Sequence, residues 1–289
     1  MAKPLIVVTG KNGQLGRELE TLAASFTGLD FLFTGREELD LNNPDSIPAF
    51  FKEHRPAYVV NCAAYTAVDK AETERETAYA VNAVAAGNIA KACEELNAVY
   101  IGISTDYVFN GNGTSPYLTT ADCDPVNYYG YSKYMGEQLA REFCSKSIII
   151  RTSWVYSRYG NNFVKTMLRL MKERPEIRVV NDQLGSPTWA ADIAAAIVQV
   201  IQQIEAGKAV YGIYHYTGKG VISWYDFALA IRDTAQLSCE VLPIPSSAYP
   251  TPAKRPAYSA LDTAAFTKDY GILPKDWNTA LQECIRQLS

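Results

Sequence analysis

Tyr129 and Lys133 are the two residues whose types and spacing best suit proton transfer. They stand four positions apart near the start of an expected helix, 128–144, so their side chains share one helix face. A phenol with a pKa of about 10 transfers protons poorly at neutral pH, but an adjacent ammonium stabilises the phenolate. The pair predicts a tyrosine acid or base assisted by a lysine. The alternative is that Tyr129 is one packing aromatic among the tyrosines of 128–131.

A second polar group lies at the end of an apolar run at 99–104. Residues 104–109 read Ser-Thr-Asp-Tyr-Val-Phe. Active sites of parallel sheets form at the carboxyl ends of strands. Thr105 is therefore expected to hold a reacting carbonyl oxygen, with Asp106 beside it and Tyr129 supplying the proton. Together these residues predict catalysis at a carbonyl group.

A glycine loop directly follows the first apolar run, 5–9, and opens an expected helix at 14–24. Such a loop gives a tight turn, lets the backbone approach a pyrophosphate and packs the helix closely on the strand. It predicts a dinucleotide cofactor, with Lys133 binding the nicotinamide ribose. The cofactor-binding residues expected in the loop are Gly10, Asn12, Gly13, Gln14, Leu15 and Gly16.

The end of the second expected strand, 31–34, bears on the choice of cofactor. The strand is followed by Gly35 and Arg36, and no acid occurs before Glu37. A guanidinium here suits a 2′-phosphate, so NADPH is favoured, while NADH is also considered. Asp40 and Leu41 are expected to flank the adenine. The alternatives are that Arg36 is a solvated charge and that Asp40 only caps a turn.

These residues need a scaffold, and the first half of the chain alternates strand-like runs with helical patterns. Such alternation predicts an α/β fold, a Rossmann-like doubly wound parallel sheet with a smaller C-terminal α/β domain. The expected strands are 5–9, 31–34, 58–61, 99–104 and 148–152, and the helices between them are 14–24, 45–54, 74–96 and 128–144.

The second half is less regular. We expect helices at 162–172, 190–204 and 223–235 and short strands at 177–180 and 213–216. Five prolines between 243 and 256 exclude regular helix or central strand and predict a wrapping loop or lid. The predicted division is an NADP-binding domain, 1–153, completed by about 189–216, and a substrate domain, 154–289.

Composition limits the partners. The 289 residues are 48% hydrophobic, and 27 basic against 31 acidic residues give a net charge of −4, which disfavours nucleic acid and anionic membranes as partners. Six cysteines without a Cys-x-x-Cys pair and only two histidines disfavour a zinc site. The sequence shows no export signal or membrane span, so a cytoplasmic protein is expected.

Eight short segments together match one enzyme family. They are 10–16 (GKNGQLG), 61–72 (NCAAYTAVDKAE), 104–109 (STDYVF), 129–133, 151–156 (RTSWVY), 160–163 (GNNF), 181–188 (NDQLGSPT) and 251–256 (TPAKRP). Through them the chain resembles the extended short-chain dehydrogenase/reductases and, more narrowly, the dTDP-4-dehydrorhamnose reductases. The resemblance implies NADPH-dependent reduction of the C4 carbonyl of dTDP-4-dehydro-L-rhamnose to dTDP-L-rhamnose.

The resemblance also assigns residues to the cofactor and to the nucleotide sugar. It implies that Ala63, Ala64 and Tyr65 line the cofactor, and it implies substrate contacts at Thr66, Val68, Thr105, Asp106, Tyr129, Trp154, Asn162, Gln183 and Arg255. Among these, Arg255 is the best chemical match for a diphosphate. Packing, surface or capping roles are the alternatives. The resemblance also implies a bound magnesium ion, but no carboxylate cluster has a ligand spacing that places it, and association into a homodimer stays open.

Two other functions are considered. A nucleotide-sugar dehydratase or epimerase is related, but dehydratases follow the threonine with Asp-Glu, whereas Asp106 is followed here by Tyr107, which cannot act as that carboxylate base. A noncatalytic regulatory subunit, like the β subunit of methionine adenosyltransferase, also resembles this family. The presence of Thr105, Tyr129 and Lys133 favours a catalytic protein over this noncatalytic alternative.

Overall fold

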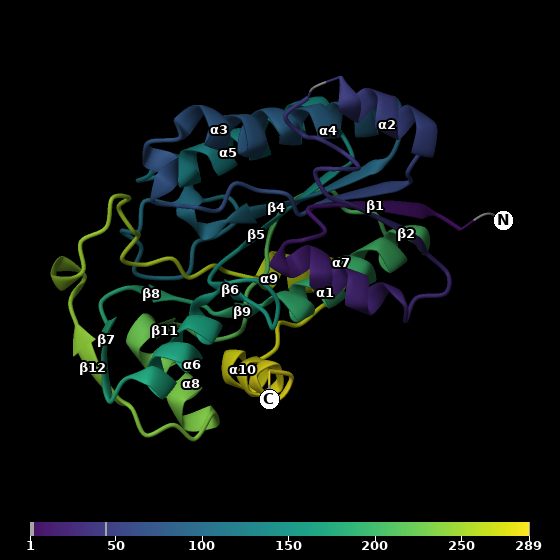
Figure 1. The fold of residues 1–289 in the computed structure, drawn as a ribbon. Coiled ribbons are helices and arrows are strands. Elements are labelled where there is room, and N and C mark those ends of the chain that lie inside the picture. The colour runs from purple at the N-terminus through teal and green to yellow at the C-terminus, as the bar shows by residue number, and fades with distance from the viewer. Residues whose placement is uncertain (1–2, 44, 289) are drawn as a thin grey trace.

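The computed structural model describes residues 3–43 and 45–288 and is built on a six-stranded parallel sheet (Figure 1). The strand order is β10-β5-β4-β3-β1-β2, with the direction of winding reversing between β1 and β3. This confirms the predicted α/β class, and the reversal creates a crevice outside the carboxyl ends of the strands. The strands are β1 Leu5–Thr9, β2 Asp30–Thr34, β3 Tyr58–Asn61, β4 Val99–Thr105, β5 Ser147–Thr152 and β10 Gly212–His215.

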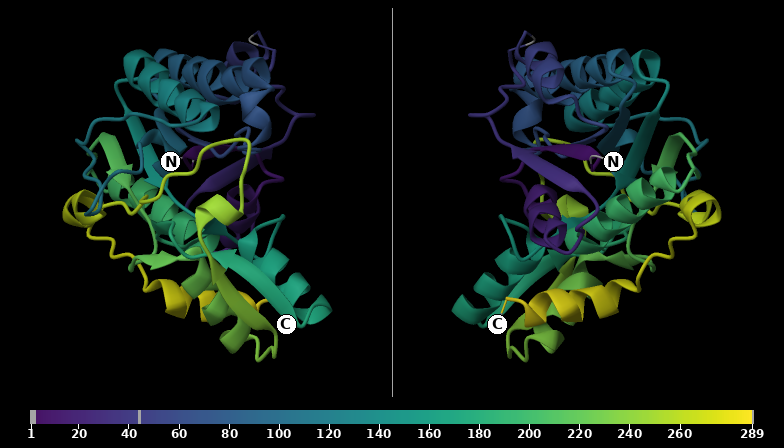
Figure 2. Two further views of the ribbon diagram at one scale, coloured as in Figure 1. Left: turned by 90° about the vertical axis from the view of Figure 1, so that its left-hand side faces the viewer. Right: turned by 90° about the vertical axis from the view of Figure 1, so that its right-hand side faces the viewer.

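Helices cover both faces of this sheet, which explains why its strands are continuously apolar. Along β1, Ile6 and Val8 pack in a core with α7, whereas Val7 packs in a core on the opposite face with residues of α2 and α4. Figure 1 shows α1 and α7 on one side of the sheet and α2, α4 and α5 on the other side, and Figure 2 gives two further views of the same arrangement. The helices are α1 Gln14–Ala23, α7 Ala190–Glu205, α2 Ser46–His54, α4 Ala85–Glu95 and α5 Tyr128–Phe143.

A second hydrophobic core lies in the C-terminal half, below the sheet in Figure 1. Its helices pack beside small two-stranded sheets that pair β7 with β12, β8 with β11 and β6 with β9. The elements are β6 Val155–Tyr156, α6 Phe163–Glu173, β7 Glu176–Val180, β8 Leu184–Gly185, β9 Thr188–Trp189, β11 Ile222–Ser223, α8 Trp224–Thr234, β12 Glu240–Ile244 and α10 Trp277–Arg286.

Two expected elements differ from the structure. The helix predicted over 74–96 contains a π-helical turn, Ala80–Val84, between α3 Arg75–Tyr79 and α4, and the Asn82 side chain of this turn accepts a hydrogen bond from the Tyr65 nitrogen. The proline-rich stretch begins inside β12, which accommodates Pro243 because, among the described residues, this strand pairs with β7 alone. A 3₁₀ turn, Ser246–Ala248, follows. Helices α9 Ala264–Tyr270 and α10 were not predicted.

Candidate active site

The glycine loop has the geometry that a dinucleotide requires. Gly10 adopts a positive φ of 72°, and a Cβ there would lie 2.7 Å from the Ala63 nitrogen. A Cβ on Gly16 would overlap the Gly10 carbonyl oxygen. Because α1 starts at Gln14 with no side-chain cap from Gly13, its first amides point toward the loop. The residues present therefore fit a bound pyrophosphate.

A cavity of about 180 Å³ continues from the glycine loop along the end of β2. It brings together five predicted cofactor residues, Gly10, Arg36, Asp40, Leu41 and Ala63. The Arg36 side chain is 78% exposed, and its Nε lies 3.8 Å from Asp40 Oδ1. Six further lining residues were not predicted: Thr9, Thr34, Gly35, Leu39, Asn42 and Val81. Most of them adjoin predicted residues in the chain, whereas Val81 comes from the π-helical turn, for which the sequence carries no signal.

Asn82 was missed by the sequence analysis, yet it joins two parts of the site. Its Oδ1 accepts a hydrogen bond from the Tyr65 nitrogen at 2.8 Å, and its Nδ2 donates to the Tyr65 carbonyl oxygen at 3.0 Å. The same Nδ2 lies 3.0 Å from Ser132 Oγ, which donates to the Tyr129 carbonyl oxygen. The π-helical turn thus connects the cofactor-lining segment after β3 to the start of α5.

Thr105 and Tyr129 meet at the carboxyl end of β4. Removal from water raises the pKa of Tyr129 to about 12, partly offset by a hydrogen bond with the Thr105 side chain. Thr105 Oγ1 also donates to Asp106 Oδ1 at 3.0 Å, and burial raises the pKa of Asp106 to about 7. The ring of Tyr107 packs edge-on against Tyr129, with centroids 5.7 Å apart. At neutral pH Tyr129 is protonated and can donate a proton.

Lys133 lies on the same face of α5 as Tyr129, as predicted, but its ammonium makes a different contact. Its Nζ donates to the Ile103 carbonyl oxygen at 2.7 Å, and the side chain is 9% exposed. Burial lowers the Lys133 pKa to about 8, while Glu137 and Cys62 act in the opposite direction. The expected depression of the Tyr129 pKa by Lys133 is not found, because the ammonium points to β4.

A buried ion pair connects α5 to the central sheet. Arg151 Nη2 lies 2.6 Å from Glu137 Oε2, and both side chains are 2% exposed. Ser104 donates a hydrogen bond to Glu137, and Arg151 Nη1 lies 3.5 Å from His215 Nε2. The pair links α5 to β4, β5 and β10. The sequence does not predict this pair, because the two charges belong to separate elements.

Arg255, expected to contact a diphosphate, is paired within the chain. Its guanidinium forms two hydrogen bonds with the Asp69 carboxylate, one of them from Nη2 to Oδ2 at 2.9 Å, and Nη1 also donates to the Ala253 carbonyl oxygen. This pair lowers the Asp69 pKa; burial acts to lower the Arg255 pKa, but the hydrogen bond with Asp69, together with the nearby Tyr107, raises it above its usual value. The contact fixes the proline-rich segment against the connection after β3, next to Tyr107.

Asn162 and Gln183 also have partners in the chain. Asn162 caps α6, accepting from the Lys165 nitrogen, and its Nδ2 donates to Gln14 Oε1 at 3.0 Å and to the Ser157 carbonyl oxygen at 2.6 Å. The structure thus gives Asn162 a capping role beside the glycine loop. Gln183 Nε2 donates to Ser246 Oγ at 2.9 Å.

Trp154 adopts a positive φ of 48° and stacks on Trp224, with ring centroids 3.6 Å apart and planes 7° apart. A Cβ on Gly185 would lie 2.5 Å from the Trp154 ring, so only glycine fits there. Strained backbone held by packing is typical of functional positions. Thr66 is exposed and Val68 half-buried in the connection after β3.

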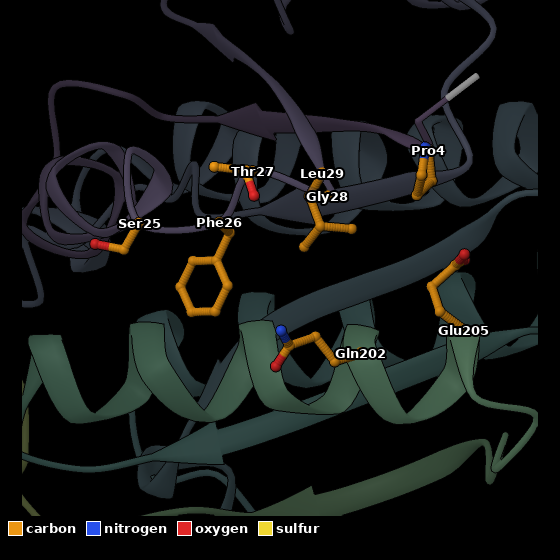
Figure 3. Close-up of a pocket in the computed structure, with 8 residues that line it drawn as sticks. All are labelled: Pro4, Ser25, Phe26, Thr27, Gly28, Leu29, Gln202 and Glu205. Atoms are coloured by element: carbon orange, nitrogen blue, oxygen red, sulfur yellow. The ribbon is translucent and has the colours of Figure 1, made fainter. Parts of the chain in front are cut away.

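Another hollow, of about 380 Å³, lies between α7 and the connection from α1 to β2 (Figure 3). It is lined by Pro4, at the start of β1, whereas the glycine loop follows the end of β1. The hollow therefore lies at the amino ends of the parallel strands, whereas Tyr129 lies at their carboxyl ends, and the hollow is not part of the candidate site.

Three further features concern only the part of the chain that the structure describes. Residues 3–43 and 45–288 contain no group of three or more His, Cys, Asp or Glu side chains that could hold a metal ion. Within the same residues, no helix combines the length and apolar character needed to cross a membrane. All six cysteines are free thiols.

Known proteins of one family are similar to this chain along nearly its whole length. The family model of the RmlD substrate binding domain matches residues 4–289. The dTDP-4-dehydrorhamnose reductase of Aggregatibacter actinomycetemcomitans is 44% identical, covering 96% of this chain and 97% of the relative. That of Escherichia coli K12 is 40% identical, covering 98% and 97%.

Solved structures agree with these relatives. The dTDP-4-dehydrorhamnose reductase of Bacillus anthracis, in complex with NADP, superposes with a TM-score of 0.93 at 39% identity and covers 99% of this chain and 100% of its own. The UDP-glucose 4-epimerase of Thermus thermophilus shares the fold with a TM-score of 0.81, at only 20% identity. The epimerase likeness therefore extends to the fold alone.

Proposed function

Because this chain belongs to the dTDP-4-dehydrorhamnose reductase family, we infer that it reduces the C4 carbonyl of dTDP-4-dehydro-L-rhamnose and forms dTDP-L-rhamnose. The cofactor is NADPH, as the NADP complex of the Bacillus anthracis relative indicates. The observation that carries this function is the meeting of Thr105 and a protonated Tyr129 beside a glycine loop with dinucleotide geometry.

The chain's own residues supply the acid half of the reaction. Bound NADPH supplies the hydride. As negative charge develops on the carbonyl oxygen, the Tyr129 phenol donates its proton to that oxygen and the Thr105 hydroxyl stabilises it. The raised pKa of Tyr129 keeps the phenol protonated before the reaction, which suits the direction of reduction. Lys133 is proposed to bind the nicotinamide ribose and to contribute its positive charge near the site.

We propose the domain division 1–153 with 189–216 for the cofactor and 154–289 for the nucleotide sugar. The separate hydrophobic core of the C-terminal half supports it. Trp154, held by Trp224, is proposed to pack against the sugar or nucleotide. Arg255 is proposed to reach the diphosphate, which requires exchange of its Asp69 partner for the phosphate oxygens. Binding energy from the nucleotide half then orients the sugar over the nicotinamide.

A coupled assay that generates the 4-keto sugar in situ and follows NADPH absorbance tests this function. Tyr129→Phe is expected to lower kcat by about 100-fold or more, since only the general acid is lost. NADPH affinity, measured by fluorescence titration, is expected to stay near that of the wild type. Tyr131→Phe is the matched control, because this tyrosine of the same helix is 42% exposed.

Two results contradict the proposal in different ways. Turnover near wild type in Tyr129→Phe would remove this residue as the proton donor. Tight NADPH binding by the wild type without oxidation by any 4-keto nucleotide sugar would favour the regulatory-subunit alternative.

A further inference from the structure

The first turn of α5, which carries Tyr129, is held by side chains on both sides of that residue. Asn127 caps the helix, and its Oδ1 accepts a hydrogen bond from the Gly130 nitrogen at 2.8 Å. Glu72, which lies 56 residues before Tyr128 in the chain, accepts a hydrogen bond from the Tyr128 nitrogen at 2.7 Å through its Oε1. The first amides of a helix have no partner within the helix, and helix ends fray. Tyr129 therefore lies between two backbone positions that side chains fix.

Glu72 also suits this place by its charge. The first turn of α5 reads Tyr-Tyr-Gly-Tyr and carries no acid of its own. A carboxylate near a helix N-terminus is stabilised by the helix dipole, so Glu72 supplies from another element the charge that this turn lacks. Arg75 Nη2 lies 3.4 Å from Glu72 Oε2, and the Arg75 guanidinium lies over the Tyr128 ring, 4.9 Å from its centroid. The Glu72 carboxylate thus contacts both a backbone amide and a cation.

The 3₁₀ turn Lys70–Glu72 is itself anchored. Ala71 at its centre is fully buried. Asp69, directly before the turn, accepts hydrogen bonds from Arg255 and, at 3.1 Å, from the Ala253 nitrogen. The contact with the Ala253 nitrogen does not depend on Arg255, so it remains when Arg255 turns to a diphosphate. The carboxylate at the end of this turn therefore has a fixed base.

The position of this first helical turn decides where the Tyr129 hydroxyl lies. The turn packs closely on the segment after β4, since a Cβ on Gly130 would lie 2.1 Å from the Tyr107 carbonyl oxygen. The Tyr129 phenol shares a hydrogen bond with Thr105, two residues before Tyr107. Catalytic groups must be held within about 0.5 Å of their productive geometry. A small displacement of the turn is therefore enough to slow the reaction although every catalytic group is still present.

We propose that Glu72 is a positioning residue of the reaction, because by accepting the Tyr128 amide it holds the Tyr129 phenol in place. This rests on the proposed function. Glu72 is not among the residues that line the cofactor cavity. Its removal is therefore expected to slow proton transfer without weakening the binding of NADPH.

Single-turnover oxidation of bound NADPH by the 4-keto sugar, followed by absorbance in the full chain, tests this assignment. Glu72→Ala is expected to slow the reaction about tenfold, while the Kd of NADPH stays within about twofold of the wild type. Glu72→Gln keeps an oxygen that can accept the Tyr128 amide and is expected to restore most of the rate. Glu76→Ala is the matched control, because it removes an exposed acid of the neighbouring helix α3.

Glu72→Ala in a Tyr129→Phe background separates positioning from a general loss of structure. A residue that acts through the Tyr129 hydroxyl is expected to cause little further loss once that hydroxyl is gone. Equal rates in Glu72→Ala and Glu76→Ala, equal losses in Glu72→Ala and Glu72→Gln, or an undiminished loss in the Tyr129→Phe background overturn the assignment.

Thermal melting establishes that each variant is folded. Glu72→Asp, whose shorter side chain draws the carboxylate back from the amide, replaces Glu72→Ala if that variant is not folded. A wild type that binds NADPH but oxidises it with no 4-keto nucleotide sugar would instead contradict the proposed function, and with it the reaction that Glu72 supports.

Discussion

Replacing Lys133 by methionine is expected to reduce turnover and, at neutral pH, to leave the fold as stable as before or more stable. The wild-type chain buries the ammonium, which lowers its pKa from 10.5 to about 8. Methionine has a similar length and no charge, so the variant avoids the desolvation cost. It also loses the hydrogen bond from Nζ to the Ile103 carbonyl oxygen.

The magnitude follows from the two pKa values. At about 1.4 kcal/mol per pKa unit, the buried charge of Lys133 lowers the free energy of unfolding by about 3 kcal/mol below pH ~8. Loss of the hydrogen bond costs the variant about 1–3 kcal/mol, so the net change near neutral pH is a gain of about 0–2 kcal/mol.

The sign of the pH dependence follows from proton binding. Between pH ~8 and ~10.5 the unfolded chain binds the Lys133 proton and the folded chain releases it, so wild-type stability rises with pH. The free energy of unfolding of the wild type therefore rises by about 2 kcal/mol between about pH 6.5 and about pH 9.5 through Lys133, and the variant lacks this contribution.

Urea denaturation of wild type and Lys133→Met at these two pH values measures the difference directly. Taking the difference cancels the titration of every other group. The exposed Lys91 on α4 provides the control, since Lys91→Met also removes one positive charge. A stability difference between wild type and Lys133→Met that stays constant across this range would refute a depressed Lys133 pKa. Undiminished turnover in the variant would refute its role in the site.

Three other substitutions test separate parts of the structure. Arg36→Ala is expected to reduce the preference for NADPH by about 1 kcal/mol, because this charge is largely exposed, and an unchanged ratio of NADPH to NADH affinity would exclude it from the site. Arg151→Met leaves Glu137 charged and buried and is expected to cost about 3–5 kcal/mol in urea denaturation; a loss below about 1 kcal/mol would contradict the buried pair. Gly136→Ala places a Cβ on the carbonyl oxygen of Asn82 and is expected to cost about 1–3 kcal/mol and to lower turnover, whereas wild-type melting and activity would show that α5 can shift freely.

Much of the fold and part of the site are readable from the sequence because they depend on local patterns. The glycine spacing of the loop, the four-residue interval from Tyr129 to Lys133 and the alternation of strand and helix are each set within a few residues. The capping box of α8 is likewise local. The Ser223 side chain accepts a hydrogen bond from the Asp226 backbone nitrogen, and the Asp226 side chain accepts one from the Ser223 backbone nitrogen. The sequence accordingly predicts the sheet, the dinucleotide loop and the Tyr-Lys pair.

The tertiary structure alone decides which polar groups find each other. Asp69 and Arg255 are 186 residues apart, and Glu72 and Tyr128 are separated by 56. The direction of the Lys133 ammonium depends on the carbonyl that β4 presents, and the role of Asn82 depends on a π-helical turn packed against α5. A side chain's spacing along the chain determines its face, but its partner is determined by which strand ends and loops the fold brings within hydrogen-bond distance. That pairing is a property of the folded topology, because buried polar groups must be satisfied by whatever neighbours the fold supplies.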